Sequence, residues 1–329
     1  MQTLTPQKQS LKTRGSKLLH EWKKSLGRYW QLYLLLIPVV ANFVIFHYVP
    51  MTGIQIAFKD FMLNLGTWGS EWIGFEHFER FFNAYNFWTI LSNTLILSVV
   101  SLAFSFPLSV GLALLLNEIR HKKLNSALQT IFIAPHFVST VVVVGMMQAF
   151  LSPETGVINI ILEKLGFIEE GIYFTRLEQW FRPMYIIELI WKESGWGTII
   201  YLAALSGVDE QLYEASVIDG AGRFKQLLHI TLPCILPTII TLLILRMGSF
   251  LDSGFDQIYL MLNSYNRDVA TVFDTYVYDV GLTGTITAPA GTTNYSYSAT
   301  VGVFRSVVSL ILVVTSNALA KLAGEEGVY

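Results

Sequence analysis

Charged side chains within long apolar stretches are the residues of this chain whose types and positions suggest chemistry. A charge inside an apolar helix is costly, so it normally faces a polar cavity or an oppositely charged partner. Two interpretations stay open: the residues line a polar path, or they form structural ion pairs between helices, for example Arg246 with Glu188. Lys192 and Glu193 are also compatible with a bend. The candidate path residues, two tryptophans included, are Glu188, Trp191, Lys192, Trp196, Arg246, Asp252 and Arg305.

Other reactive residue types do not form a recognisable catalytic set. The six histidines have no metal-ligand spacing, and no nucleophile–base pattern is present. The phosphate-binding pattern G-x4-G-K-[ST] is missing, so we do not expect ATP hydrolysis by this chain. Cys234, the single cysteine, excludes an internal disulfide, and its apolar neighbours predict a buried, inert thiol. We therefore expect a non-catalytic chain without a metal or a cofactor. We also expect no nucleic-acid partner, because the net charge is −2.

The composition indicates that most of the chain lies in lipid. Hydrophobic residues make up 53% of the 329 residues and charged residues 14%, against about 25% in a soluble domain, which is too little charge to cover a soluble surface. A spanning helix needs about 20 apolar residues, and loops would expose unpaired backbone groups to lipid. We predict an all-α integral membrane protein with six spans, which are Trp30–Val49, Phe87–Leu116, Leu128–Phe150, Met184–Leu205, Leu232–Leu251 and Ala299–Ala320.

Lysines and arginines predict the orientation of these spans. They are frequent before Trp30, which favours a cytoplasmic N-terminus, and six crossings return the C-terminus to the same side. We expect a cytoplasmic segment at 1–29, a membrane domain at 30–322 and a cytoplasmic tail at 323–329. Two interpretations of the first segment stay open, a disordered basic tail or a short helix on the inner leaflet, because apolar residues recur at helical spacing at Leu19, Trp22, Leu26 and Trp30.

The connection between the fourth and fifth predicted spans, at residues 207–231, contains a spaced motif. It reads Glu214-Ala215-Ser216, three residues, Gly220, nine residues, Ile230, one residue, and Leu232-Pro233. This resembles the EAA motif, E-A-A-x3-G-x9-I-x-L-P, of the permease subunits of binding-protein-dependent ABC importers, with Ser216 in place of the second alanine. Counting spans from the N-terminus places the loop in the cytoplasm, although its own charge is not positive.

The residue types in this loop suit a docking element. Asp209 can cap a helix that begins at Glu210, because its side chain accepts a bond from a free backbone N–H. Small side chains at 215 and 216 allow another protein to approach the backbone. Gly220 permits a turn between two short helices, since it tolerates dihedral angles that other residues avoid. Pro233 suits the start of the next span, where a missing N–H costs little.

The resemblance implies which loop residues contact a separate ATPase subunit. In the family, a short coupling helix fits a cleft of the ATPase and transmits its closure to the membrane, with Glu214 as a contact residue and Gly220 as a hinge. The coupling residues carried over to this chain are Glu214, Ala215, Ser216, Asp219, Gly220, Arg223, Ile230, Leu232 and Pro233.

Further stretches resemble the MalF-like, and within it the LplB-like, permeases of oligosaccharide and polysaccharide importers. These stretches are Pro135–Phe137, Gly254–Tyr259, Thr275–Tyr278 and Gly302–Val308. The resemblance implies the type I importer fold in a bacterial cytoplasmic membrane. It implies a heterodimer with a second permease, two ATPase subunits that bind ATP and Mg²⁺, an extracytoplasmic solute-binding protein, and a saccharide cargo moved by alternating access.

The cargo implied by the resemblance includes acidic, alginate-like saccharides. Lys192, Arg246 and Arg305 would suit a carboxylated sugar, although the acidic residues of the same spans could neutralise them. An ion-coupled secondary transporter is the alternative function, but such proteins typically show inverted repeats and an ion site, and neither is visible. An integral membrane enzyme is a third alternative, without a supporting residue pattern.

Overall fold

The structure is a computed structural model that describes residues 27–286, 289, 294–324 and 327. The chain divides after Gln55 into two units, which are described separately. Leu19, Trp22 and Leu26, the residues of the predicted membrane-surface helix, lie outside the described residues. The interpretation of that segment therefore stays a prediction.

The first unit is built on one long helical stretch. α2 (Trp30–Phe43) continues through a π-helical turn, η1 (Val44–Tyr48), and α3 (Val49–Met51) into the 3₁₀ turn η2 (Thr52–Phe58). The π turn lies just before Pro50, whose missing N–H removes one bond of the regular α-helical ladder. The predicted first span, Trp30–Val49, is confirmed and is longer than expected, because the apolar helical stretch runs from Trp30 to Phe58.

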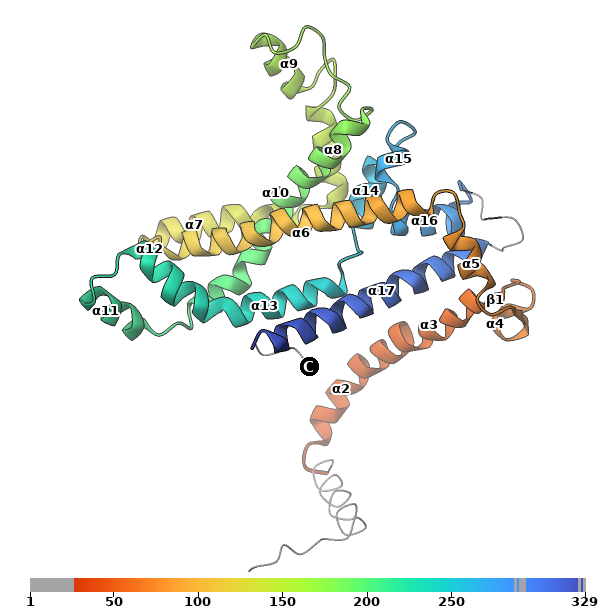
Figure 1. Ribbon diagram of the computed structural model, residues 1–329, viewed down its shortest axis with the longest axis horizontal. Coiled ribbons are helices and arrows are strands. Elements are labelled where there is room, and N and C mark those ends of the chain that lie inside the picture. The colour runs from red at the N-terminus through yellow and green to blue at the C-terminus, as the bar shows by residue number, and fades with distance from the viewer. Residues whose placement is uncertain (1–26, 287–288, 290–293, 325–326, 328–329) are drawn as a thin grey trace, which may run out of the picture. The chain divides into compact units, whose positions relative to one another are not determined.

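The second unit is organised around α6 (Phe87–Asn117) and α10 (Glu178–Leu205), which pack along each other (Figure 1). Ser109 Oγ donates to Ser194 O at 3.1 Å, and Gly197 lies so close that a Cβ there would be 2.7 Å from the same hydroxyl. Only small residues at these positions allow such an approach. The second and fourth predicted spans are therefore both long helices, and α10 extends six residues N-terminal to its predicted start at Met184.

The third predicted span, Leu128–Phe150, is wrong as a continuous helix. The structure has α7 (Lys122–Ile133), the 3₁₀ turn η3 (Ala134–Phe137) and α8 (Thr140–Phe150), with the two apolar helices bent by 95°. The chain leaves the helical conformation at Val138 and Ser139, whose ψ angles are 132° and 137°. Pro135 lies in the turn and has no N–H to continue the α7 ladder. The segment is a broken span or a re-entrant loop.

The fifth and sixth predicted spans are helices that lie side by side as α13 (Leu232–Gly248) and α17 (Asn294–Leu322) (Figure 1). α13 is preceded by α12 (Arg223–Gln226) and a π turn, η4 (Leu227–Thr231). It ends three residues earlier than predicted, and Asp252 lies in the irregular segment that follows the helix.

The predicted number of six spans is only partly matched among the described residues. Length and composition identify four spanning helices there, or five when the bent pair is counted as one span. α10 is 28 residues long but is less apolar than these helices. Its middle carries Glu188, Lys192 and Glu193, which lower its hydropathy.

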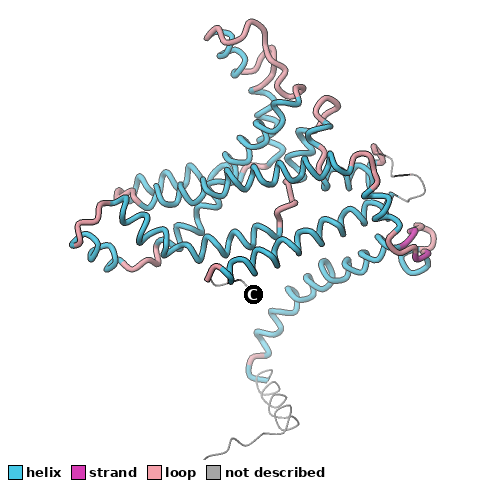
Figure 2. The backbone as a smooth tube through the Cα atoms, viewed as in Figure 1, coloured by secondary structure: helices cyan, strands magenta, loops and turns pink. Residues whose placement is uncertain are grey.

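Short elements connect the long helices, and the two-residue ribbon is the only strand structure in the described part (Figure 2). β1 (Lys59–Asp60) pairs antiparallel with β2 (Glu71–Trp72) around α4 (Gly66–Gly69), and α5 (Glu76–Phe82) follows. His77 Nε2–H donates to Lys59 O at 3.1 Å, and burial lowers the pKa of His77, which favours the neutral imidazole. The predicted all-α fold is correct apart from this ribbon.

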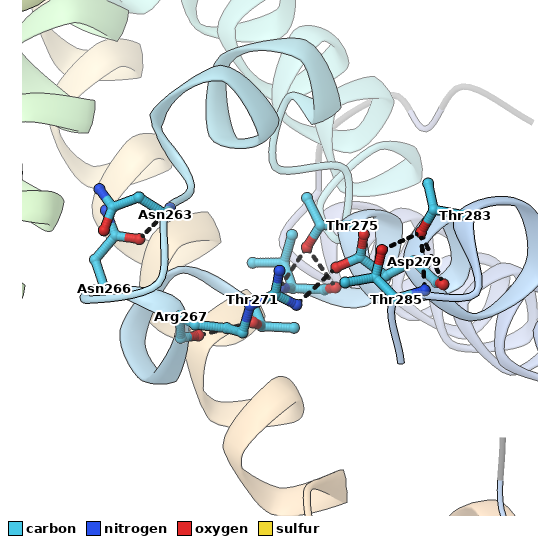
Figure 3. A network of polar contacts seen from close by, with 9 residues as sticks. Asn263, Asn266, Arg267, Thr271, Thr275, Asp279, Thr283 and Thr285 are labelled. Atoms are coloured by element: carbon cyan, nitrogen blue, oxygen red, sulfur yellow. Dashed lines mark hydrogen bonds and ion pairs between the residues drawn. The ribbon is translucent and has the colours of Figure 1, made fainter. Parts of the chain in front are cut away.

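The segment between α13 and α17 folds into further short helices. They are α14 (Phe255–Met261), α15 (Arg267–Ala270), α16 (Phe273–Tyr278) and the π turn η5 (Asp279–Thr283), while α9 (Val157–Lys164) lies between α8 and α10. Figure 3 shows the polar contacts of this segment: Arg267 Nη1 lies 2.9 Å from Asp279 Oδ2, and Thr283 Oγ1 donates to Asp279 O at 3.0 Å. These contacts stabilise the segment that connects α13 to α17.

Candidate functional site

The loop that carries the motif forms a capped helix, α11 (Glu210–Ile218), at the end of the second unit opposite α5 (Figure 1). The N–H of Gln211 donates to Asp209 Oδ1 at 2.9 Å, which confirms the predicted cap. At the other end, the N–H of Ala221 donates to Ser216 O at 2.9 Å, and Gly220 has a φ of +77°. This positive φ confirms the predicted turn at Gly220. A residue with a side chain would strain the backbone at such an angle, so the position favours glycine.

Side-chain hydrogen bonds close this loop onto the start of the following helix. Ser216 Oγ donates to Tyr213 O at 2.7 Å and accepts from Gln226 Nε2 at 2.9 Å, while the hydroxyls of Tyr213 and Thr231 lie 2.9 Å apart. Ser216, the position at which the motif departs from alanine, is thus a bonding residue within the loop. These bonds connect α11 to α12 and η4, and η4 continues directly into α13.

The outer surface of the loop exposes apolar side chains next to the motif residues. Ile218 is 87% exposed, Phe224 72% and Val217 63%. Large apolar side chains that lie together on a surface are typical of interaction sites. Val217 and Ile218 were not singled out by the sequence interpretation, although this apolar pair directly precedes Asp219-Gly220. This exposed patch has the composition of a protein-docking surface.

The other predicted coupling residues are distributed around this patch. Glu214, Ala215, Asp219 and Gly220 are exposed, and Pro233 occupies the first turn of α13. Ile230 and Leu232 are half-buried within the helical segment that follows the loop. Arg223 Nη1 lies 3.8 Å from Glu118 Oε2, so it connects α12 to the end of α6 through an exposed ion pair.

A polar cavity of about 490 Å³ lies between α6, α10 and the end of α13. The structure brings four of the predicted path residues together in its wall, namely Glu188, Lys192, Arg246 and Asp252. Trp196 and Arg246 both line a second cavity of about 220 Å³, which shares Ser101, Leu102 and Glu193 with the first. Trp191 faces an apolar hollow beside α8 and α9 instead, and Arg305 lines a shallow pocket on α17.

The irregular segment after α13 is held at the cavity by two hydrogen bonds from its neighbours. Tyr185 OH donates to Ser253 O at 2.8 Å, and Gln257 Nε2 donates to Tyr185 O at 2.9 Å. Both bonds are buried and connect this segment to α10. Asp252 therefore reaches the cavity from a fixed loop, whereas Glu188 and Lys192 reach it from successive turns of α10.

The charged residues differ in whether they are paired. Within the described part of the chain, Arg246 makes no ion pair with Glu188, so that predicted structural pair is wrong. Arg305 binds Asp274 and lies 3.6 Å from Asp252, which agrees with a structural role for this arginine. The remaining contacts are between Lys192 Nζ and Thr140 Oγ1, and between Glu193 Oε2 and His136 Nδ1 at 3.2 Å.

Two serines of the cavity wall were missed by the sequence interpretation. Ser98 Oγ and Ser253 Oγ are buried and have no hydrogen-bond partner among the described residues, and the same is true of Glu188 Oε1. A sequence signal existed for α6, because Ser98, Ser101, Ser105 and Ser109 recur at helical spacing within an apolar span. Their position beside the cavity gives it polar walls inside a membrane domain.

The predicted burial of Cys234 is wrong. The side chain is exposed, because this part of α13 packs on one side only among the described residues. Its apolar neighbours reflect the membrane helix on which it lies and do not form a surrounding core.

Comparisons with known proteins assign a family to most of the chain. Residues 105–323 match the family described as "Binding-protein-dependent transport system inner membrane component". Protein LplB of Bacillus subtilis (strain 168) is 50% identical over 308 residues, covering 94% of both chains. The polygalacturonan/rhamnogalacturonan transport system permease protein YteP of the same organism is 49% identical, over 91% of this chain and 90% of the relative.

Solved structures share the same fold over nearly the whole chain. One is the crystal structure of a bacterial alginate ABC transporter in complex with an alginate pentasaccharide-bound periplasmic protein. The matching chain is 40% identical with a TM-score of 0.82, over 93% of this chain and 99% of that chain. A second structure, of a bacterial ABC transporter involved in the import of the acidic polysaccharide alginate, matches with a TM-score of 0.81 and 40% identity, over 92% and 98% of the two chains.

Proposed function

The chain belongs to the family of binding-protein-dependent transport system inner membrane components, and we propose from this premise how its parts act in a saccharide importer. It is the non-catalytic, membrane-spanning permease subunit of an ABC importer for oligosaccharides or polysaccharides. A second, similar permease subunit completes the path. ATP and Mg²⁺ bind to a separate pair of ATPase subunits, and an extracytoplasmic solute-binding protein delivers the cargo.

The observation that carries this proposal is the exposed apolar patch on the hydrogen-bonded loop that bears the motif. Val217, Ile218 and Phe224 are solvent-exposed apolar groups on a loop that is capped and hydrogen-bonded to the start of α13. An apolar patch with charged neighbours is what a cleft of another protein can bind. The N- and C-termini then lie on the cytoplasmic side, with the ATPase.

The coupling runs from the ATPase to the cavity through one continuous segment. Closure of the ATPase pair on ATP moves α11, which is bonded to η4, and η4 leads directly into α13. Arg246 lies in the last turn of α13, at the wall of the cavity. ATP binding thus opens the cavity outward to receive saccharide from the binding protein, and release of ADP returns it to the inward-facing state.

Copurification tests the docking role of the loop. The chain is expressed with the ATPase and second permease of its own transporter, and the retained ATPase is quantified after affinity purification. We expect Glu214→Lys to reverse the charge at the contact, and Gly220→Trp to distort the turn, so that each reduces the retained ATPase at least about tenfold, the loss expected for about 1.4 kcal/mol of binding energy.

Glu163→Lys is the matched control, because Glu163 is also an exposed helical glutamate but lies on α9, away from the loop. Retention of the ATPase at the wild-type level in both loop variants would contradict the proposal. Transport by the purified chain alone, driven by a proton or sodium gradient, would instead support an ion-coupled carrier.

A further inference from the structure

The cavity wall contains one cation, Arg246, whose side chain has no partner among the described residues. Of the two cavity-lining cations, Lys192 donates to Thr140 Oγ1, whereas the guanidinium of Arg246 has no hydrogen bond or ion pair within residues 27–286, 289, 294–324 and 327. Arg305, the third cation of these helices, is already bound by Asp274 and Asp252. Arg246 is therefore the cation that can bind a group from outside the chain.

The position of Arg246 explains how the unpaired charge is tolerated. It lies in the last turn of α13, where the partial negative charge of the helix C-terminus stabilises a cation without a carboxylate. The residue is exposed within the chain and lines both the 490 Å³ cavity and the adjoining 220 Å³ cavity. Its guanidinium is therefore accessible to a ligand in either cavity.

The acidic residues of the cavity do not neutralise Arg246. Glu193 faces His136, Asp252 faces Arg305, and Glu188 lies one helical turn before Lys192 on α10. Asp256, the remaining acidic residue, lies in the first turn of α14. None of the four carboxylates forms an ion pair with Arg246 among the described residues.

The wall also leaves neutral and acidic oxygen atoms without partners. Ser98 Oγ, Ser253 Oγ and Glu188 Oε1 belong to cavity-lining residues that are at most 5% exposed, and in the part of the chain that the structure describes none of the three atoms has a hydrogen-bond partner. A buried polar atom without a partner costs free energy, so a ligand that pairs such atoms is favoured. Hydroxyl-rich ligands supply many donors and acceptors for this purpose.

We infer that this cavity holds a uronate unit of an acidic saccharide, with Arg246 binding its carboxylate and Ser98, Ser253 and Glu188 binding its hydroxyl groups. A guanidinium donates two parallel N–H bonds that match the two oxygens of a carboxylate. A neutral hexose can accept these bonds only through hydroxyl oxygens, which carry no negative charge and therefore bind a guanidinium more weakly. Arg246 is thus a specificity-determining residue that selects carboxylated over neutral cargo. The inference rests on the proposed importer function and names the chemical class of its cargo.

Binding to the complete transporter tests this selectivity. The complex of both permeases and the ATPase pair is placed in nanodiscs. The binding protein is left out, because its own ligand preference would hide the ligand preference of the cavity. Trigalacturonate and trimannuronate are titrated, each beside its carboxyl-reduced neutral counterpart. We expect the wild-type complex to bind at least one uronide at least about tenfold more tightly than its neutral counterpart, since hydrogen bonds to charged groups contribute about 1.5–3 kcal/mol.

Variants of one residue then assign the preference. Arg246→Gln should abolish it, and Arg246→Lys should reduce it, because an ammonium cannot form the paired bonds. Asp256→Asn is the matched control: it removes a cavity charge of the opposite sign and should leave the uronide preference intact or increase it. Variants are compared only after copurifying with the ATPase, so misassembly is not counted as loss of binding.

Two results would overturn the inference: equal or tighter wild-type binding of the neutral forms of both uronides, or an unchanged uronide preference in either Arg246 variant. Neither result affects the importer function itself. That function is read separately in the same nanodiscs as ATP hydrolysis stimulated by the binding protein, and its loss in the wild-type complex would contradict the proposed function.

Discussion

Two arginines of similar sequence context have different surroundings in the folded chain. Arg246 and Arg305 both lie within apolar helices, and the sequence offers no reason to separate them. In the structure Arg305 bridges Asp274 and Asp252 and so connects α17 to the loop after α13, whereas Arg246 has no such partner among the described residues. An intramembrane charge therefore has a structural or a binding role according to what lies opposite, which only the tertiary packing decides.

Gly220 allows a test of backbone conformation in isolation. Its φ is +77°, and a Cβ built there would meet no atom within 4 Å. Gly220→Ala should therefore destabilise the loop by about 1 kcal/mol through backbone strain alone, and lower the affinity for the ATPase several-fold. Gly222→Ala is the matched control, because Gly222 is equally open but has an ordinary φ of −73°. ATPase affinity measured by titration of detergent-solubilised permease dimer checks this, and equal effects of the two substitutions would contradict it.

At the scale of elements, the approach of α7 to α10 depends on one missing side chain. A Cβ at Gly195 of α10 would lie 1.9 Å from Phe132 O of α7, a distance that no real contact shows. The bent pair α7 and α8 is thus held against α10 at its α7 end by a backbone-to-backbone contact, which small residues make available in membrane helices.

Gly195→Ala should separate these helices and destabilise the protein by about 1–3 kcal/mol or more, as expected of overpacking. Gly111→Ala is its control, because Gly111 also lies inside a long helix, α6, but has open space around it. There the substitution should be neutral or stabilising by up to about 1 kcal/mol, since alanine favours the helix. Thermal unfolding of the purified complex measures both, and equal midpoints for the two variants would rule out the proposed packing contact.

The elements that follow from local chemistry were predicted well, and those set by tertiary contacts were not. The cap at Asp209 and the turn at Gly220 depend on the residue itself and were foreseen. The break at Val138 was missed, because the flanking residues are as apolar as a continuous span. The cavity was foreseen only as a set of charges: the sequence does not reveal that the chain after Gly248 folds back to place Ser253 beside α10.

At the scale of the whole molecule, the chain leaves most of its apolar helix surface uncovered by itself. In an 18-residue apolar stretch of each spanning helix, the share of residues that the chain itself buries is 0%, 28%, 17% and 17%, in chain order. A soluble core of this composition would bury far more. Lipid and partner subunits must therefore supply much of the apolar environment that stabilises the helices.

We expect assembly to stabilise this chain measurably. A partner that binds only the folded form raises the free energy of unfolding, and about 2 kcal/mol would raise the midpoint by about 3 °C in a chain of this length. Thermal unfolding in one detergent, for the chain alone and for the chain copurified with the second permease and ATPase, tests this. The Glu214→Lys chain should lose the part of the increase that the ATPase contributes. Identical midpoints for the free and assembled wild-type chain would show that lipid-like contacts suffice.

The exposed thiol of Cys234 has a practical consequence for observing this machine at work. It is the single cysteine of the chain and lies one residue after Pro233, where the coupling loop becomes α13. Arg246 follows on the same helix, about 18 Å farther along at 1.5 Å per residue. A fluorescent dye attached to this native sulfur would need no engineered labelling position. It would report when the proposed closure of the ATPase pair moves the start of α13, the helix that leads to the cavity.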